Sequence, residues 1–164
     1  MAQLTRNLFI PCIDTSAAKD GSGYTPIDLS TIFELSWNPQ EETKGYICYK
    51  VDSTEITGYQ PELPQEIVLD SDNPIYTFVH NFGMQFPVGT DAVVPVLLVE
   101  PNANSETVVG HEWKSAVISM QNMNTVDGKL SFTLKLNGDK TDGTVAITVD
   151  SQTGVKTIAY TPVA

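Results

Sequence analysis

The sequence predicts a mainly β protein in which two packed antiparallel sheets are flanked by one α-helix. Most stretches alternate apolar and polar residues with the period of a strand. Turn pairs such as Asp127-Gly128 and Asn137-Gly138 separate several of them. Only residues 73–86 have the period of a helix. About ten strands need two layers to bury their apolar faces, with the helix covering one end or flank.

The chain of 164 residues predicts a single domain, residues 1–164, because neither a linker nor an internal repeat interrupts it. A hydrophobic fraction of 41% with 18% charged residues excludes a disordered chain and a coiled coil. Residues 4–13 are expected to form the first strand. The Gly-, Ser- and Asp-rich loop 14–26 is expected to be a flexible surface segment.

Residues 31–37 alternate as a further strand. The face expected to lie in the core carries Phe33, Leu35 and Trp37. Residues 45–59 form the longest β-like stretch and return, after two prolines, through residues 65–70. We therefore expect a long acidic β-hairpin arm over about residues 45–70. Residues 40–70 hold seven acidic and two basic side chains, so at least one face of this arm should be solvated.

The helix signal is an apolar stripe at helical spacing. Its members are Ile75, Phe78, Val79, Phe82 and Phe86. Asp72 or Asn73 can cap the first turn, Pro74 suits the first helical position, and Pro87 ends the segment.

The remaining sequence predicts strands again. Residues 92–100 are apolar and interrupted by a proline, which predicts a buried strand that is bulged or near an edge. Residues 107–124 predict two strands or one bent strand. Residues 129–136 alternate cleanly, and residues 143–149 are expected to pair with residues 155–160. The inward positions of the alternating strand are Leu130, Phe132, Leu134 and Leu136.

Charge restricts the classes of partner. The chain holds 20 acidic and 9 basic residues, for a net charge of −11. Such a field repels phosphate, and a single Arg leaves little means of reading bases, so a DNA-gripping function is excluded. No apolar run approaches membrane-spanning length. The N-terminal residues lack the apolar core of a signal peptide, so we expect synthesis in a cytoplasm without export.

No catalytic, metal or cofactor motif is found. His80 is expected at the boundary of the helix, and His111-Glu112 lacks the second His of a zinc helix. Loops at 70–73 and 137–142 begin like calcium loops but lack the twelfth-position Glu. No glycine-rich phosphate-binding motif is present. The sequence therefore predicts a protein that is not an enzyme and needs no cofactor.

The two cysteines, Cys12 and Cys48, lie in apolar runs. Buried free thiols are the favoured interpretation, because Cys is commonly a small core residue. A disulfide between them stays open, because pairing cannot be read from sequence.

The order of several motifs resembles the major tail-tube protein of siphophages that infect low-GC Gram-positive bacteria, over nearly the whole chain. The motifs are Asn38-Pro39-Gln40-Glu41-Glu42-Thr43, Thr57-Gly58-Tyr59-Gln60-Pro61, Asp72-Asn73-Pro74-Ile75-Tyr76, Pro87-Val88-Gly89-Thr90-Asp91 and Asn137-Gly138-Asp139. The resemblance implies two roughly orthogonal sheets with a flanking helix. It also implies hexameric rings, whose inner sheets join into one barrel, stacked into a tube in the virion tail.

The resemblance further implies that the arm builds the inner barrel, where negative charge would let DNA pass without sticking. The acids predicted to face the lumen are Glu41, Glu42, Asp52, Glu55, Glu62 and Glu66. The residues predicted to make contacts between rings are Asp14, Lys19, Asp20 and Tyr24.

The partners implied are other copies of this chain, the tape-measure and tail-terminator proteins, and DNA as passing cargo. A monomeric β-sandwich adhesion or carbohydrate-binding module is the alternative function. The order of Cys12, Trp37 and Cys48 offers it some support, although the spacing is too short for an immunoglobulin domain.

Overall fold

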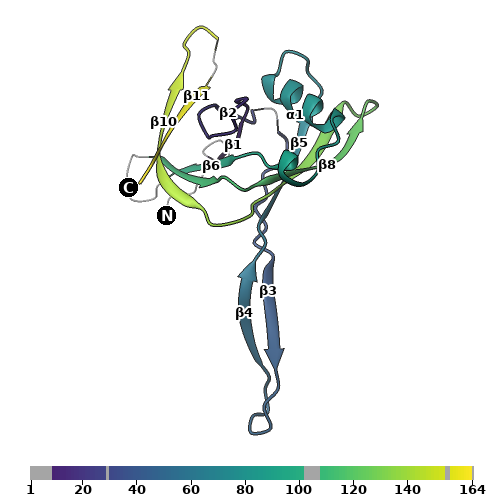
Figure 1. Ribbon diagram of the computed structural model, residues 1–164, viewed down its shortest axis with the longest axis vertical. Coiled ribbons are helices and arrows are strands. Elements are labelled where there is room, and N and C mark those ends of the chain that lie inside the picture. The colour runs from purple at the N-terminus through teal and green to yellow at the C-terminus, as the bar shows by residue number, and fades with distance from the viewer. Residues whose placement is uncertain (1–8, 29, 102–107, 154–155, 164) are drawn as a thin grey trace.

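The computed structural model describes residues 9–28, 30–101, 108–153 and 156–163, and it is mainly β with one α-helix (Figure 1). A six-stranded sheet has the order β11-β10-β7-β6-β1-β2. Its strands are β1 (Ile10–Asp14), β2 (Tyr24–Pro26), β6 (Val96–Pro101), β7 (Val108–Trp113), β10 (Thr141–Val149) and β11 (Lys156–Pro162). A three-stranded sheet has the order β5-β9-β8. Its strands are β5 (Glu62–Val68), β8 (Val117–Asn124) and β9 (Lys129–Lys135). These two sheets and the helix form the body of the subunit.

The six-stranded sheet curls into a nearly closed half-barrel. Tyr24 on β2 and Tyr160 on β11 belong to opposite edges of the sheet, yet their ring centroids lie 6.4 Å apart in an edge-to-face contact. The cavity inside the curl is filled by a small apolar core. Its buried members are Ile10, Cys12, Tyr24, Leu97, Val99, Val145 and Ile158.

The other face of this sheet packs against the three-stranded sheet and α1 (Pro74–Met84). Strand β9 supplies the buried residues Leu130, Phe132 and Leu134, which confirms the predicted alternation. Strand β6 is buried on both faces, with Val96 and Leu98 in this main core and Leu97 and Val99 in the half-barrel. The prediction that this segment lies near an edge is wrong, because Pro95 precedes the strand and β6 runs between β1 and β7.

The helix begins as its sequence predicts and ends at Met84, two residues before the predicted end. The Asn73 side chain accepts a hydrogen bond from the backbone N–H of Ile75 at 3.0 Å, and Pro74 occupies the first turn. Phe86 is the exception, because it lies beyond the helix, is 80% exposed and has a φ of 50°. A short 3-10 helix, η2 (Gly89–Ala92), leads from there into Pro95 and β6.

A separate two-stranded ribbon projects far from the body (Figure 1). It consists of β3 (Pro39–Lys44) and β4 (Ser53–Tyr59), joined by the tip loop, residues 45–52. We call residues 39–59 the arm. The prediction that the arm spans residues 45–70 is therefore wrong. Strand β4 pairs with β3, and β5 pairs with β9 in the body. The alternation over residues 46–51 mimics a strand, but these residues turn the chain.

Two further predictions are corrected by the structure. Residues 31–37 do not form a strand, but run beside β5 with isolated bridges from Ser30 to Ile67 and from Ser36 to Glu62. Trp37 lies past the end of β5 and is 62% exposed, so it is not a core residue. Loop 14–26 includes the three-residue strand β2, which pairs with β1. Residues 4–8 of the predicted first strand lie outside the described residues.

The close packing of the half-barrel predicts that one methyl group added at Gly110 destabilises it. An ideal Cβ at Gly110 of β7 would lie 2.5 Å from Cγ2 of Val145, so Gly110→Ala should lower the free energy of unfolding by about 1–3 kcal/mol. The matched control is Gly58→Ala on β4, where a Cβ meets nothing within 4 Å. Urea unfolding measures both variants, and equal losses of stability would contradict this packing.

Candidate assembly surfaces

The arm lacks support from the rest of the subunit. Every residue of β3 is exposed, and so is every residue of β4 except Gly58. Among the described residues, β3 and β4 pair only with each other, so both outer edges of the ribbon leave backbone groups unpaired. An isolated two-stranded hairpin is marginally stable in water. Contact with another chain would therefore stabilise the arm by pairing its edges and covering its exposed faces.

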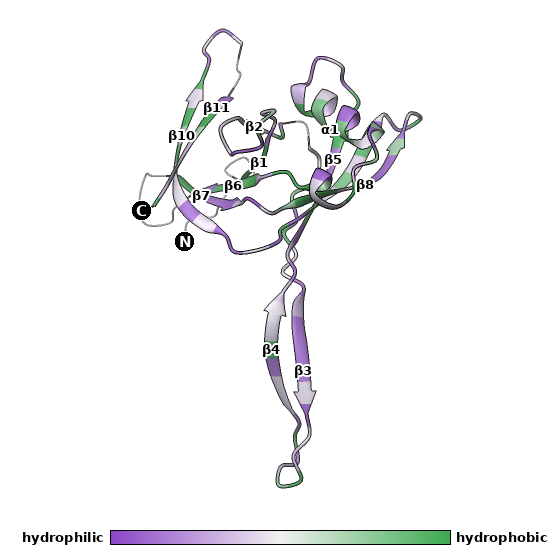
Figure 2. Cartoon of the chain, viewed as in Figure 1, coloured by the Kyte–Doolittle hydropathy of each residue, from purple (hydrophilic) through white to green (hydrophobic). Residues whose placement is uncertain are grey.

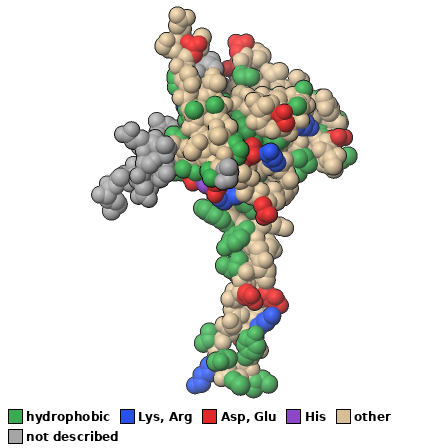
Figure 3. Space-filling view, turned by 60° about the vertical axis from the view of Figure 1, so that its left-hand side comes forward, with side chains coloured by type: hydrophobic (Ala, Val, Ile, Leu, Met, Phe, Trp, Pro, Cys, Tyr) green, Lys and Arg blue, Asp and Glu red, His purple; other side chains and the backbone are tan. Residues whose placement is uncertain are grey.

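The tip loop of the arm is fully exposed, and most of its side chains are apolar apart from Lys50 and Asp52. Figure 2 shows hydrophilic residues along β3 and hydrophobic ones in the tip loop, and Figure 3 shows apolar side chains gathered along the arm and at its end. Ile47 is 105% exposed, and Val51 is 80% exposed. The other large exposed apolar residues of the arm are Tyr46, Tyr49, Ile56 and Tyr59. Exposed apolar clusters of this kind mark interaction surfaces.

The six acids predicted to face a lumen fall into two groups. Four of them, Glu41, Glu42, Asp52 and Glu55, lie on the arm and are exposed. The arm also carries two lysines, so its own net charge is −2. On β3 and β4, Glu42 lies directly opposite Glu55, a like-charge pair that weakens the ribbon.

The other two acids lie on β5 of the body and are paired. The Glu62 carboxylate lies 2.6 Å from Lys135 Nζ, and the Glu66 carboxylate lies 2.7 Å from Lys129 Nζ. The hydrogen bond from Lys129 lowers the pKa of Glu66, and the same contact raises the pKa of Lys129. These ion pairs cancel much of the charge that β5 would offer to a lumen. The sequence could not show them, because both lysines come from β9.

Of the four residues predicted to contact another ring, two are buried inside the subunit. Asp14 is 0% exposed, and its carboxylate accepts backbone hydrogen bonds from Gly21 at 2.7 Å, Ser16 at 2.9 Å and Gly23 at 3.3 Å. The carboxylate thus organises the loop that the sequence predicts to be flexible. Tyr24 is likewise buried, at 7% exposed, and the predicted contact of both residues with another ring stays a prediction.

Tyr24 is held inside the half-barrel. Its hydroxyl donates a 2.5 Å hydrogen bond to the Glu112 carboxylate, which is itself buried. Burial, together with this hydrogen bond, raises the pKa of Tyr24. The remaining two predicted residues, Lys19 and Asp20, are exposed. Lys19 Nζ lies 3.3 Å from the carbonyl of Asp91 and 5.7 Å from the centre of the Phe82 ring.

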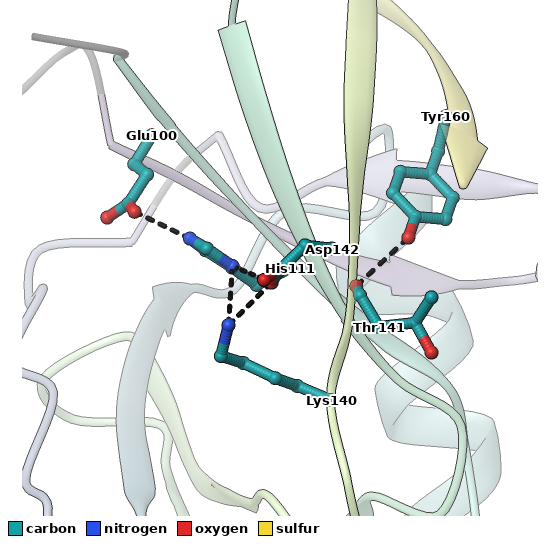
Figure 4. A network of polar contacts seen from close by, with 6 residues as sticks. All are labelled: Glu100, His111, Lys140, Thr141, Asp142 and Tyr160. Atoms are coloured by element: carbon teal, nitrogen blue, oxygen red, sulfur yellow. Dashed lines mark hydrogen bonds and ion pairs between the residues drawn. The ribbon is translucent and has the colours of Figure 1, made fainter. Parts of the chain in front are cut away.

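A polar network that the sequence did not predict crosses three neighbouring strands of the half-barrel (Figure 4). His111 on β7 lies between Glu100 on β6 and Asp142 on β10, and each ring nitrogen is 2.5 Å from a carboxylate oxygen. Both contacts are hydrogen bonds only when the imidazole carries two N–H groups. Lys140 also contacts Asp142 at 2.5 Å. The sequence did not indicate that His111 and Asp142 lie together, because β8 and β9 intervene between β7 and β10 in the chain.

The cysteines are separated, and only one is buried. Cys12 lies inside the half-barrel, and burial raises the pKa of its thiol. Cys48 is free and exposed in the tip loop, so the prediction of two buried thiols is wrong for it, and the alternative of a disulfide is not realised. The apolar residues around Cys48 suggested a core position, but they belong to the turn of the arm.

The described residues contain no group of three or more His, Cys, Asp or Glu side chains placed to hold a metal ion. His80 is half-buried and stacks on Tyr76 with ring centroids 5.6 Å apart. Within the same part of the chain, no helix is both long and apolar enough to cross a membrane.

Comparison with known proteins finds matches only among solved structures. No protein-family model and no curated protein matches the chain. Among solved structures, the chain is similar to one in the six-fold symmetrised cryo-EM structure of the anti-feeding prophage baseplate. The TM-score is 0.47 at 11% identity, over 87% of this chain and 96% of that chain.

The burial of the Asp14 carboxylate predicts that replacing Asp14 destabilises the fold much more than replacing Asp20 of the same loop. Asp14→Ala removes the acceptor of three backbone N–H groups and should lower the free energy of unfolding by about 2–4 kcal/mol. Asp20→Ala, at an exposed position, should change it by about 0.5 kcal/mol or less. Thermal and urea unfolding test this. A loss for Asp20→Ala that equals the loss for Asp14→Ala would contradict the assigned role.

The His111 network predicts a loss of stability in acid. Hydrogen bonds from Lys140 and His111 hold the pKa of Asp142 below its usual value. A carboxyl with a lowered folded-state pKa binds fewer protons when folded, so its stabilisation is present above about pH 4 and is lost as the pH falls further. Asp142→Asn should therefore flatten the acid limb of the stability curve.

Asp28→Asn is the opposite control, because burial raises the pKa of Asp28. Removing the ionisable carboxyl of Asp28 should steepen the fall in the free energy of unfolding at acid pH. The free energy of unfolding, measured from roughly 1.5 pH units below to roughly 2 units above the usual Asp pKa, distinguishes the two. A wild-type slope that Asp142→Asn leaves unchanged would contradict the network's contribution.

Proposed function

We propose that this chain is a structural subunit of a bacteriophage tail tube, in which hexameric rings stack and DNA passes through the lumen during ejection. The observation that carries the proposal is the arm. It leaves both β-edges unpaired and exposes a row of apolar side chains, while the body buries two cores of its own. A subunit built in this way is complete except for a surface that other copies of the chain can cover.

The choice of a tail tube among such assemblies rests on the resemblance in the sequence. The motif over residues 38–43, which includes most of β3, and the motif over residues 57–61, which includes the end of β4, belong to that resemblance, as does the start of α1. The half-barrel with a flanking helix is compatible with the architecture expected of such a subunit. The tape-measure and tail-terminator proteins would be its partners, and the virion tail its location. No catalytic step is part of this function.

A negative lumen would be supplied chiefly by the arm. Glu41, Asp52 and Glu55 are exposed on the arm, where Glu42 lies 3.7 Å from Lys44 Nζ. Glu62 and Glu66 are paired with lysines of the body. Negative charge on the wall of a narrow channel repels the phosphates of DNA and keeps the DNA mobile. The proposal therefore assigns DNA the role of a passing, non-specific cargo.

Negative-stain electron microscopy and light scattering on one concentrated sample test the proposal. We expect tubes or six-fold rings. The control lacks residues 39–59 and joins Asn38 to Gln60 through Asn-Gly, which is feasible because the Gln60 N–H donates to the Asn38 carbonyl at 3.3 Å. This variant should keep its β-sheet circular dichroism and remain monomeric. Equal masses for the wild type and the armless variant at every concentration would contradict the proposal.

One observation favours the alternative of a monomeric adhesion or carbohydrate-binding module. A cleft of about 580 Å³ at the base of the arm is lined by exposed Trp37 and Tyr59, with Gln60, Asn137 and Asp139 beside them. Aromatic faces flanked by amide and carboxylate groups suit a sugar ring. Titration with β-linked glucose or N-acetylglucosamine oligomers, followed by tryptophan fluorescence, tests it. Saturable quenching that Trp37→Ala abolishes would support this alternative.

A further inference from the structure

A second apolar surface lies on the body, between the end of α1 and strand β8. Two adjoining hollows of about 520 and 150 Å³ share Gly83 and Met120 as lining residues. Three of the chain's four methionines, Met84, Met120 and Met123, line them. Phe86 and Val88 complete the apolar wall. We call this surface the methionine groove, and the described residues that line it include His80 but no Asp, Glu, Lys or Arg.

The methionine groove is left open by the subunit itself. Phe86 is 80% exposed and Val88 is 77% exposed, while Met84 is 61% and Met123 is 46% exposed. Phe86 also has a φ of 50°, a backbone conformation that is unfavourable for a bulky side chain. Its ring gains no burial in return within the subunit. Adjacent exposed apolar residues, one of them on a strained backbone, indicate a surface that is completed by contact.

The tip loop of the arm has the matching chemistry. Residues 45–49 carry no charge, and Tyr46, Ile47 and Tyr49 are 53%, 105% and 71% exposed. The Tyr46 and Tyr49 rings meet edge to face with centroids 6.4 Å apart, so the tip is a compact apolar knob. In Figure 1 the tip lies at the far end of the arm, pointing away from the body. It therefore cannot reach the methionine groove of its own chain.

We propose that the tip loop of one copy docks in the methionine groove of another copy. This inference rests on the proposed assembly of the chain and specifies one contact of it. Each copy carries one knob and one groove on different parts of its surface, so the contact is heterologous and propagates into a ring or an open stack. Flexible methionine side chains adapt to the aromatic and aliphatic groups of the knob, and sulfur–aromatic contacts add to the burial.

Cys48 in the tip loop provides a direct test, because disulfide formation requires the two Cα atoms to approach within about 7 Å. A second cysteine is placed in the groove by Ser119→Cys, a near-isosteric change at a half-buried lining position. Asn122→Cys, at an exposed lining position, serves if Ser119→Cys does not fold. The matched control is Ser115→Cys, which is exposed in the turn between β7 and β8. Cys12 is buried and does not compete.

Each variant is concentrated, imaged and then oxidised with copper phenanthroline, and copies are separated by non-reducing electrophoresis. We expect Ser119→Cys or Asn122→Cys to give at least about tenfold more intermolecular cross-link than Ser115→Cys or the wild type, because docking raises the effective concentration of the pair. Cys48→Ser should abolish the product. Tubes or rings without this cross-link would overturn the inference and leave the proposed function standing. Cross-linked dimers without tubes would support the contact and contradict the tube. The absence of both the tubes or rings and the cross-link would contradict both the contact and the proposed function.

A charge pair supplies an independent readout without cysteines. Ile47→Asp should reduce the assembled fraction in sedimentation, because a carboxylate would lose its hydration on entering a mostly apolar groove. Met123→Lys in the same chain should restore it at least in part, since the two charges then meet between copies. Recovery of assembly in the double variant is the expected result. Single and double variants that assemble like the wild type would overturn the contact.

Discussion

Burial of strand β6 on both faces is the constraint on which the rest of the subunit depends. Four consecutive residues, Val96 to Val99, are at most 3% exposed, and they divide alternately between two cores. One face requires the half-barrel to curl around Leu97 and Val99. The other requires α1 and the three-stranded sheet to cover Val96 and Leu98. Each side of β6 thus dictates one layer of the body.

The body satisfies this constraint without the arm, and the arm therefore has no place in either core. The chain leaves the body at Asn38 and returns at Gln60, where the two residues hydrogen-bond to each other. Between these points a thin ribbon carries opposed glutamates on its strands and an apolar tip at its end. Such a segment is costly for an isolated subunit and favourable once other copies cover it. The same property connects the fold to the proposed function and to the methionine groove.

Local patterns in the sequence predicted those parts of the fold that local forces decide. The stripe and cap of α1, the alternation of β9 and the pairing of β10 with β11 all follow from periodicity and turn residues close in the chain. The arm was misplaced because Ile47, Tyr49 and Val51 alternate like a strand, and periodicity carries no information on whether a partner is present. Trp37 was assigned to the core because residues 31–37 alternate like a strand, although they form only isolated bridges.

The candidate site was less predictable, because its contacts join distant segments. Nothing near Asp14 in the sequence shows that its carboxylate is buried, and the lysine partners of Glu62 and Glu66 lie on another strand. The network around His111 depends on a strand order that skips two strands of the chain. The methionine groove is likewise assembled from α1, the residues after it and β8. The sequence correctly predicted an acidic arm, but it did not predict which two strands pair to form it.

The central claim is that the arm is completed only by other copies of the chain. Amide hydrogen exchange, resolved along the chain, measures this in dilute subunits and in concentrated, assembled material. The account predicts that backbone amides of β3, β4 and the tip loop exchange rapidly in the dilute subunit, and that they become strongly protected on assembly while β6 stays protected throughout. Arm amides that are already protected in the monomer, or that stay unprotected in the assembly, would contradict it.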